Sequence, residues 1–109
     1  MARPTTHDPR STGLIDEFCD ALWLEDGLAK NTLDSYRSDL SQYAAWLDEQ
    51  GGRNLLSASN ADIQAYLGVF FRRKTRASSA ARLLSSLKRF YRYCLRQGKI
   101  KSDPTLRID

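Results

Sequence analysis

A chain of 109 residues has the size of one domain, and a composition of 41% hydrophobic and 28% charged residues is too apolar for a disordered protein. No apolar run approaches the ~20 residues of a membrane-spanning helix, and residues 1–10 lack the apolar core of a signal peptide, so we expect a cytoplasmic protein without membrane contact. The net charge of +4 conceals a separation of signs: residues 72–101 contain eleven Lys or Arg and no acid, whereas residues 8–62 contain eleven of the thirteen acids, which favours a polyanionic partner.

Prolines and apolar spacing divide the chain into a tail, a helical domain and a linker. All three prolines lie outside residues 10–103, and apolar residues recur at intervals of three and four without the alternation of a strand. We predict an all-α fold, with a flexible tail over residues 1–12, a helical domain over 13–102 and the start of a linker over 103–109.

The first predicted helix covers residues 14–26 and ends at Gly27, a residue suited to the left-handed conformation that follows many helices. Its inward face contains Leu14, Phe18 and Leu22. The predicted outward face is acidic and consists of Asp16, Glu17 and Asp20.

The second predicted helix opens at Asn31, whose side chain we expect to cap the amide of Asp34. Small hydroxyls and exposed amides at such a helix start suit a phosphate, and simple capping is the alternative. The predicted core stripe is Leu33, Tyr36, Leu40, Tyr43 and Leu47.

The third predicted helix begins at Ser59, with Asp62 completing a capping box. Its predicted core residues are Ile63, Tyr66, Leu67 and Phe70. It ends in a run of cations, Arg72, Arg73 and Lys74.

The last predicted helix covers residues 78–97 and stops at Gly98. Its predicted core face is Ala80, Leu83, Leu84, Leu87, Phe90, Tyr91, Cys94 and Leu95. The opposite stripe is Ser78, Arg82, Ser85, Ser86, Arg89, Tyr93 and Arg96. Short serines allow close approach and arginines reach guanine or phosphate, so this stripe can enter a major groove of double-stranded DNA.

Catalytic and metal chemistry have few candidates in this sequence. Cys19 and Cys94 match no zinc spacing and are predicted to be core residues, and the only histidine, His7, lies in the tail. No glycine-rich phosphate loop or carboxylate cluster is present, and the serines lack a base. We therefore predict no metal, no cofactor and no small-molecule substrate.

Two blocks of this sequence resemble the tyrosine site-specific recombinases of the Xer type. The first comprises LWLE at 22–25, GLAKNTL at 27–33, YRSDL at 36–40 and WL at 46–47. The second is SSAARLLSSLKRFY at 78–91, followed by Asp103 and Pro104. The resemblance covers residues 14–106 and implies the amino-terminal SAM-like core-binding domain of that family, an orthogonal bundle of four to five helices that clamps duplex DNA.

The resemblance also implies which residues contact DNA. On the second helix they are Lys30, Asn31, Thr32, Ser35 and Ser38. Before and along the last helix they are Arg76, Ser78, Ser79, Arg82, Ser86, Lys88 and Arg89. Asp34 departs from the pattern, because an acid would repel phosphate.

The catalytic residues of the resembled family belong to a carboxy-terminal domain that is missing here, so no residue is predicted to be catalytic. The intact protein is implied to be an enzyme that exchanges strands through a 3′-phosphotyrosyl link without ATP or metal. Its implied partner is a second Xer-type recombinase subunit in a tetrameric synaptic complex that resolves chromosome dimers. Two alternatives stay open: a free-standing helical DNA-binding adaptor, and a helical protein-interaction module whose basic face meets an acidic protein.

Overall fold

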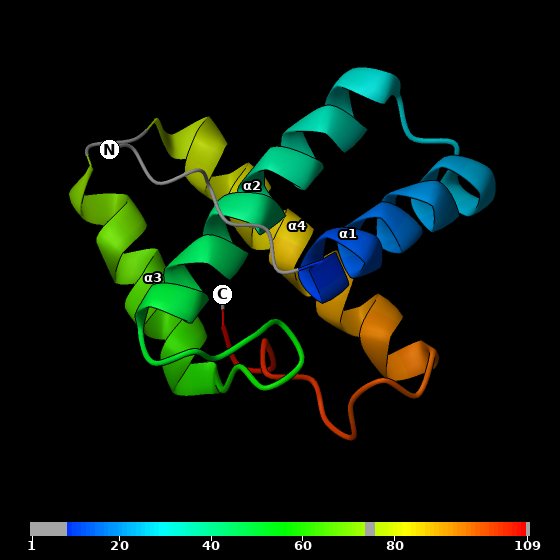
Figure 1. Ribbon diagram of the computed structural model, residues 1–109. Coiled ribbons are helices and arrows are strands. Elements are labelled where there is room, and N and C mark those ends of the chain that lie inside the picture. The colour runs from blue at the N-terminus through cyan, green and yellow to red at the C-terminus, as the bar shows by residue number, and fades with distance from the viewer. Residues whose placement is uncertain (1–8, 74–75, 109) are drawn as a thin grey trace. The chain divides into compact units, whose positions relative to one another are not determined.

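The computed structural model describes residues 9–73 and 76–108, which form helices joined by turns (Figure 1). In chain order the elements are α1 Pro9–Ala21, the π-helical turn η1 Leu22–Asp26, α2 Lys30–Glu49, α3 Asn60–Arg72 and α4 Ala77–Arg96. No strand occurs within these two described ranges, so the predicted all-α class is confirmed. The elements group into two compact units, Met1–Leu55 and Leu56–Asp109. None of the described helices is long and apolar enough to cross a membrane.

Helix α1 begins five residues earlier than the sequence predicted. It starts at Pro9, so residues 9–12 are helical although we placed them in the tail. Proline is tolerated in the first turn, where its missing N–H would have no partner in the helix, and the apolar pattern starts only at Leu14. The rest of the predicted tail, including His7, lies outside the described residues.

The acidic outward face of α1 is confirmed, and the predicted inward face is confirmed except for Leu14 and the neighbouring Ala21, which are half-buried. Ile15 and Phe18 are buried, and Asp16, Glu17 and Asp20 are exposed. The helix continues into η1, whose Leu22 is buried, and Gly27 ends it with φ +63° as predicted. The π-helical geometry of η1 was not predicted; it adds one residue per turn.

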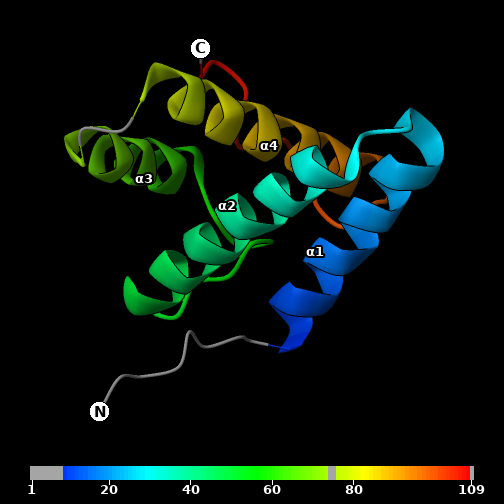
Figure 2. The same cartoon turned by 90° about the horizontal axis from the view of Figure 1, so that it is seen from above.

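Helix α2 packs against α1, and the two run in opposite directions on either side of Gly27 (Figure 2). The whole predicted core stripe of α2 is buried, joined by Asp39. The predicted cap by Asn31 is wrong, because the helix begins at Lys30 after Ala29 and no side chain caps it. The amide of Leu33 closes the first turn on the carbonyl of Ala29 at 3.1 Å.

Helix α3 begins as predicted, with a capping box. The amide of Asp62 donates to Oγ of Ser59 at 3.2 Å, and the amide of Ser59 donates to Oδ2 of Asp62 at 2.9 Å. Three of its four predicted core residues are buried, and Phe70 is half-buried. Helix α3 ends at Arg72, and Lys74 lies outside the described residues.

Helix α4 agrees with its predicted bounds to within one residue, but its buried face is rotated. Ser86 and Tyr93 are buried, although the sequence placed them on the outward stripe. Leu95, predicted in the core, is exposed. Ser86 and Tyr93 lie seven residues apart, so they share one side of α4. That side is the edge of the predicted outward stripe, next to the buried core residues Leu83 and Phe90. A hydroxyl can be buried there because Ser86 donates to the carbonyl of Leu83 at 2.8 Å.

Both cysteines are core residues, as predicted. Cys19 and Cys94 are buried free thiols, only 2% and 0% exposed. Burial, with a smaller contribution from the charges of Asp20 and Asp34, raises the pKa of the Cys19 thiol to about 11.

Candidate nucleic-acid interface

The two units carry opposite charge. Residues 1–55 hold five Lys or Arg and ten Asp or Glu, a net charge of −5, whereas residues 56–109 hold twelve and three, a net charge of +9. A polyanion is therefore attracted to the second unit and repelled by the first. The candidate contacts on the two units accordingly differ in chemistry.

Three of the five cations of α4 form a regular stripe along the helix. Arg82, Arg89 and Arg96 follow one another at intervals of seven residues, so they lie on one side of the helix, on the side away from buried Leu83, Leu87 and Cys94. Arg82 and Arg89 are half-buried and Arg96 is exposed. The stripe is roughly 20 Å long, the length of about six base pairs at 3.4 Å each.

The remaining candidates on α4 divide by exposure. Ser78 is exposed, and Ser79 and Lys88 are half-buried, so all three reach the surface. Ser86 is 0% exposed, so the prediction that it contacts DNA is corrected. A fully buried hydroxyl that already donates within the helix is not available to a phosphate.

The cations around the start of α4 lie outside its stripe. Arg76 precedes the helix as its N-cap residue, in extended conformation and exposed. Arg72 and Arg73, at the end of α3, are also exposed. These three guanidinium groups belong to the second unit and add to its positive charge.

The candidate face of α2 is polar and close to neutral. Nζ of Lys30 lies 2.9 Å from Oδ2 of Asp34, and Arg37 pairs with Asp16 of α1, so carboxylates offset both cations of α2. Asn31 and Ser38 are exposed, and Ser38 accepts from Nε2 of Gln42 at 3.1 Å. The other two candidates on this face are half-buried: Thr32 and Ser35. This face offers hydroxyls and amides for short contacts, with little net charge to attract a phosphate.

Two cations of α4 were missing from the predicted contact set. Arg92 and Arg96 are exposed, and Arg96 continues the spacing of Arg82 and Arg89. The sequence already shows that Arg96 follows Arg89 by seven residues, so this spacing could have added Arg96 to the predicted contacts. No such spacing marks Arg92, because it lies beside the stripe and not on it.

Comparison with known proteins identifies the family. The family described as "Phage integrase, N-terminal SAM-like domain" matches residues 15–98. The tyrosine recombinase XerD of Pseudomonas aeruginosa is 52% identical over 96 residues, which is 88% of this chain and 32% of that protein. XerD of Ralstonia nicotianae is 45% identical over 89% of this chain and 31% of its own length. XerD of Shewanella oneidensis is 43% identical over 100% of this chain and 35% of its own length.

These matches confirm the resemblance of the two sequence blocks to tyrosine recombinases of the Xer type. The chain spans about a third of the length of the XerD relatives. The family match extends from Ile15 to Gly98 and therefore includes residues of both units. This chain belongs to the family of phage integrase N-terminal SAM-like domains.

Proposed function

We propose that this chain binds duplex DNA through the exposed side of α4, as the half-site-binding part of a tyrosine recombinase. The observation that carries the proposal is the stripe of Arg82, Arg89 and Arg96, in a thirty-residue stretch without an acid. Arginine presents a planar fork of donors that matches both guanine edges and phosphate. Ser78 and Ser79 at the start of the helix are short enough to let its backbone approach DNA closely.

The polar face of α2 takes a secondary part in this proposal. Asn31, Thr32, Ser35 and Ser38 form short hydrogen bonds to the DNA backbone, which fix the register of the domain. To contact a phosphate, Lys30 must break its ion pair with Asp34. An exposed ion pair of this kind contributes little free energy, so a phosphate can replace Asp34.

We propose further that the chain by itself binds DNA without cutting it. All five tyrosines are buried, none more than 6% exposed, so no phenol is presented to a phosphate: they are Tyr36, Tyr43, Tyr66, Tyr91 and Tyr93. In the longer recombinase, strand exchange, pairing with a second Xer-type subunit in a tetramer and resolution of chromosome dimers would depend on residues outside this chain. A suicide DNA substrate should trap no covalent complex with this chain.

The first test is the salt dependence of binding. Each phosphate neutralised releases counterion, so the logarithm of the affinity should fall linearly with the logarithm of salt concentration, by about 0.9 per contact. Fluorescence anisotropy with a labelled 30-base-pair duplex at several salt concentrations measures this slope. A flat response would contradict the proposal and favour a protein-interaction module.

The second test distinguishes recognition of a DNA sequence by α4 from non-specific electrostatic binding to the DNA backbone. A preferred half-site is first selected from random duplexes, and each variant is then measured on it and on random DNA. Arg82→Ala and Arg89→Ala should cost about 1 to 3 kcal/mol on the selected site and much less on random DNA. The matched variants Arg72→Ala and Arg73→Ala should weaken both alike and reduce the salt slope by about one unit. Equal losses on both DNAs for Arg82 and Arg89 would show that α4 holds only the backbone.

A further inference from the structure

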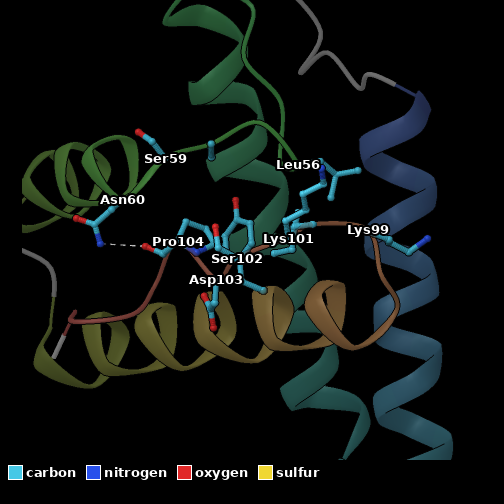
Figure 3. Close-up of a pocket in the computed structure, with 11 residues that line it drawn as sticks. Leu56, Ser59, Asn60, Lys99, Lys101, Ser102, Asp103 and Pro104 are labelled. Atoms are coloured by element: carbon cyan, nitrogen blue, oxygen red, sulfur yellow. Dashed lines mark hydrogen bonds between the residues drawn. The ribbon is translucent and has the colours of Figure 1, made fainter.

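The residues after α4 fold back against the start of α3. Within residues 103–108, here called the exit segment, Thr105 is 3% and Ile108 is 7% exposed. Asn60, the first residue of α3, donates from Nδ2 to the carbonyl of Pro104 at 3.0 Å (Figure 3). It also donates to the carbonyl of Leu106 at 3.2 Å. One side-chain amide therefore holds two carbonyls that lie more than forty residues later in the sequence.

The exit segment also has a defined fold of its own. The amide and the hydroxyl of Thr105 both donate to Oδ1 of Asp103, at 2.8 and 2.6 Å. The amides of Leu106 and Ile108 donate to the carbonyls of Asp103 and Thr105 at 3.3 and 3.1 Å. Arg107 adopts φ +73°, a left-handed conformation that costs free energy for a residue other than glycine. The contacts on either side of Arg107 must offset this cost.

A hollow lies beside each end of the segment. Pro104 lines a hollow of about 430 Å³ together with Leu56, which precedes α3, and Tyr91 of α4. Ile108 lines a second hollow with Leu67 and Phe71 of α3. The burial of Thr105 and Ile108 shows that the exit segment is packed within the second unit.

The orientation of the Asn60 amide is itself fixed. Its Oδ1 accepts from Nε2 of Gln64, one turn further along α3, at 2.5 Å. With the oxygen engaged by Gln64, the nitrogen and its two hydrogens face the exit segment. Two donors and two carbonyl acceptors are then matched.

We propose that Asn60 is a positioning residue that latches the exit segment to α3, so that the chain leaves the second unit in a fixed direction at Ile108. The sequence predicted the start of a linker at residue 103, whereas residues 103–108 are hydrogen-bonded within the second unit. The latch itself does not depend on DNA binding. Its consequence rests on the proposed function: in a longer recombinase, a fixed exit limits the directions open to whatever follows the DNA-binding part.

The test is Asn60→Asp, which keeps the size of the side chain and the acceptor for Gln64 but replaces both donors by an oxygen. An acid in the first turn of a helix is favoured by the dipole, so α3 itself is not weakened. Hydrogen exchange of this chain reads out the latch at the amides of Leu106 and Ile108. Loss of the two hydrogen bonds should speed exchange there by about fivefold or more. Tryptic cleavage after Arg107 should accelerate in parallel.

Two controls make the result decisive. The amides of Gly98 and Lys99, bonded to the carbonyls of Leu95 and Cys94 at the end of α4, should keep their exchange rates. The exposed neighbour Ser102→Ala should leave the whole pattern unchanged. Unchanged exchange at Leu106 and Ile108 in Asn60→Asp would overturn the latch, and so would an equal rise at Gly98 and Lys99, which would mean that the whole unit opens.

DNA binding distinguishes this proposal from the proposed function. Asn60→Asp should bind duplex DNA within about twofold of the parent chain, since the latch lies apart from the α4 stripe in sequence and the variant adds a single charge. Absence of DNA binding by the parent chain would overturn the proposed function while leaving the exchange test of the latch valid.

Discussion

At the scale of single residues, burial separates the side chains that this chain can present to a partner from those that hold it together. The tyrosines and both cysteines have reactive groups, yet all of them are core residues. Spacing at three and four predicted the burial of Tyr36, Tyr43, Tyr66, Tyr91 and Cys94. It placed Tyr93 on the outward stripe of α4, although Tyr93 is buried. The burial of Ser86 and Asp39 could not be predicted in this way, because polar residues carry no apolar signal.

The buried thiol of Cys19 should make stability depend on pH in the alkaline range. Its pKa is raised from 9.0 to about 11, so the folded chain keeps the proton longer than the unfolded chain does. The resulting stabilisation is complete below pH 9 and is lost as the pH rises towards 11. Urea unfolding should show the parent chain losing about 2 to 3 kcal/mol more than Cys19→Ala over this range. If the free energy of unfolding fell equally in the parent chain and in Cys19→Ala, the loss of stability could not be assigned to the Cys19 thiol.

Two glycines should respond in opposite ways to the same substitution. Gly13 lies within α1 and Gly27 follows η1 at φ +63°, and an added Cβ would meet no atom within 4 Å at either site. Gly13→Ala should therefore stabilise by about 0.5 to 1 kcal/mol through helix propensity. Gly27→Ala should destabilise by about 1 kcal/mol, because alanine is strained in the left-handed region. Urea titrations of both variants check the signs, and equal effects would exclude this explanation.

At the scale of elements, helix bounds followed from the sequence where a local signal marks them. The Ser59 box and the glycines at 27 and 98 fixed three termini correctly. The start of α1 at Pro9 and the uncapped start of α2 at Lys30 carry no such signal, so both were misplaced. The π-helical form of η1 was not visible in the spacing of its apolar residues.

The rotation of α4 decides which of its serines face a partner. Ser78 is exposed, whereas Ser86 is buried and bonded to the carbonyl of Leu83. Ser86→Ala should therefore lower stability by about 1 kcal/mol and leave DNA affinity unchanged. Ser78→Ala should weaken DNA binding with little effect on stability. Chemical denaturation and anisotropy on both variants test this, and a loss of affinity in a fully folded Ser86→Ala would restore the original prediction.

At the scale of the whole chain, the separation of charge was the part of the candidate site that the sequence predicted best. Charges are counted without knowing the fold, and the boundary between the two units at residue 55 falls between the acidic and basic parts of the chain. The choice among individual contacts was less predictable, because it depends on which side of each helix is buried. Ion pairs such as Lys30 with Asp34 also change what a cation offers to a partner.

The acidic face of α1 allows this charge separation to be tested directly. Asp16 pairs with Arg37, so the informative positions are Glu17 and Asp20, both exposed. Both positions are exposed and lie inside α1, and lysine is a good helix former, so the fold should survive. Reversing both charges raises the net charge from +4 to about +8, since each reversal adds two.

If α1 faces away from DNA, Glu17→Lys with Asp20→Lys should raise affinity for random duplex DNA by about two- to tenfold at low salt through long-range attraction alone. The gain should shrink as salt shortens the screening length, and the neutral pair Glu17→Gln with Asp20→Asn should show about half of it in logarithmic units. Anisotropy at three or more salt concentrations, with helicity checked by circular dichroism, measures both double variants against the parent chain. A gain that persists at high salt would indicate new direct contacts between α1 and DNA. A loss of binding in a folded double variant would place the acidic face at the DNA and contradict this prediction.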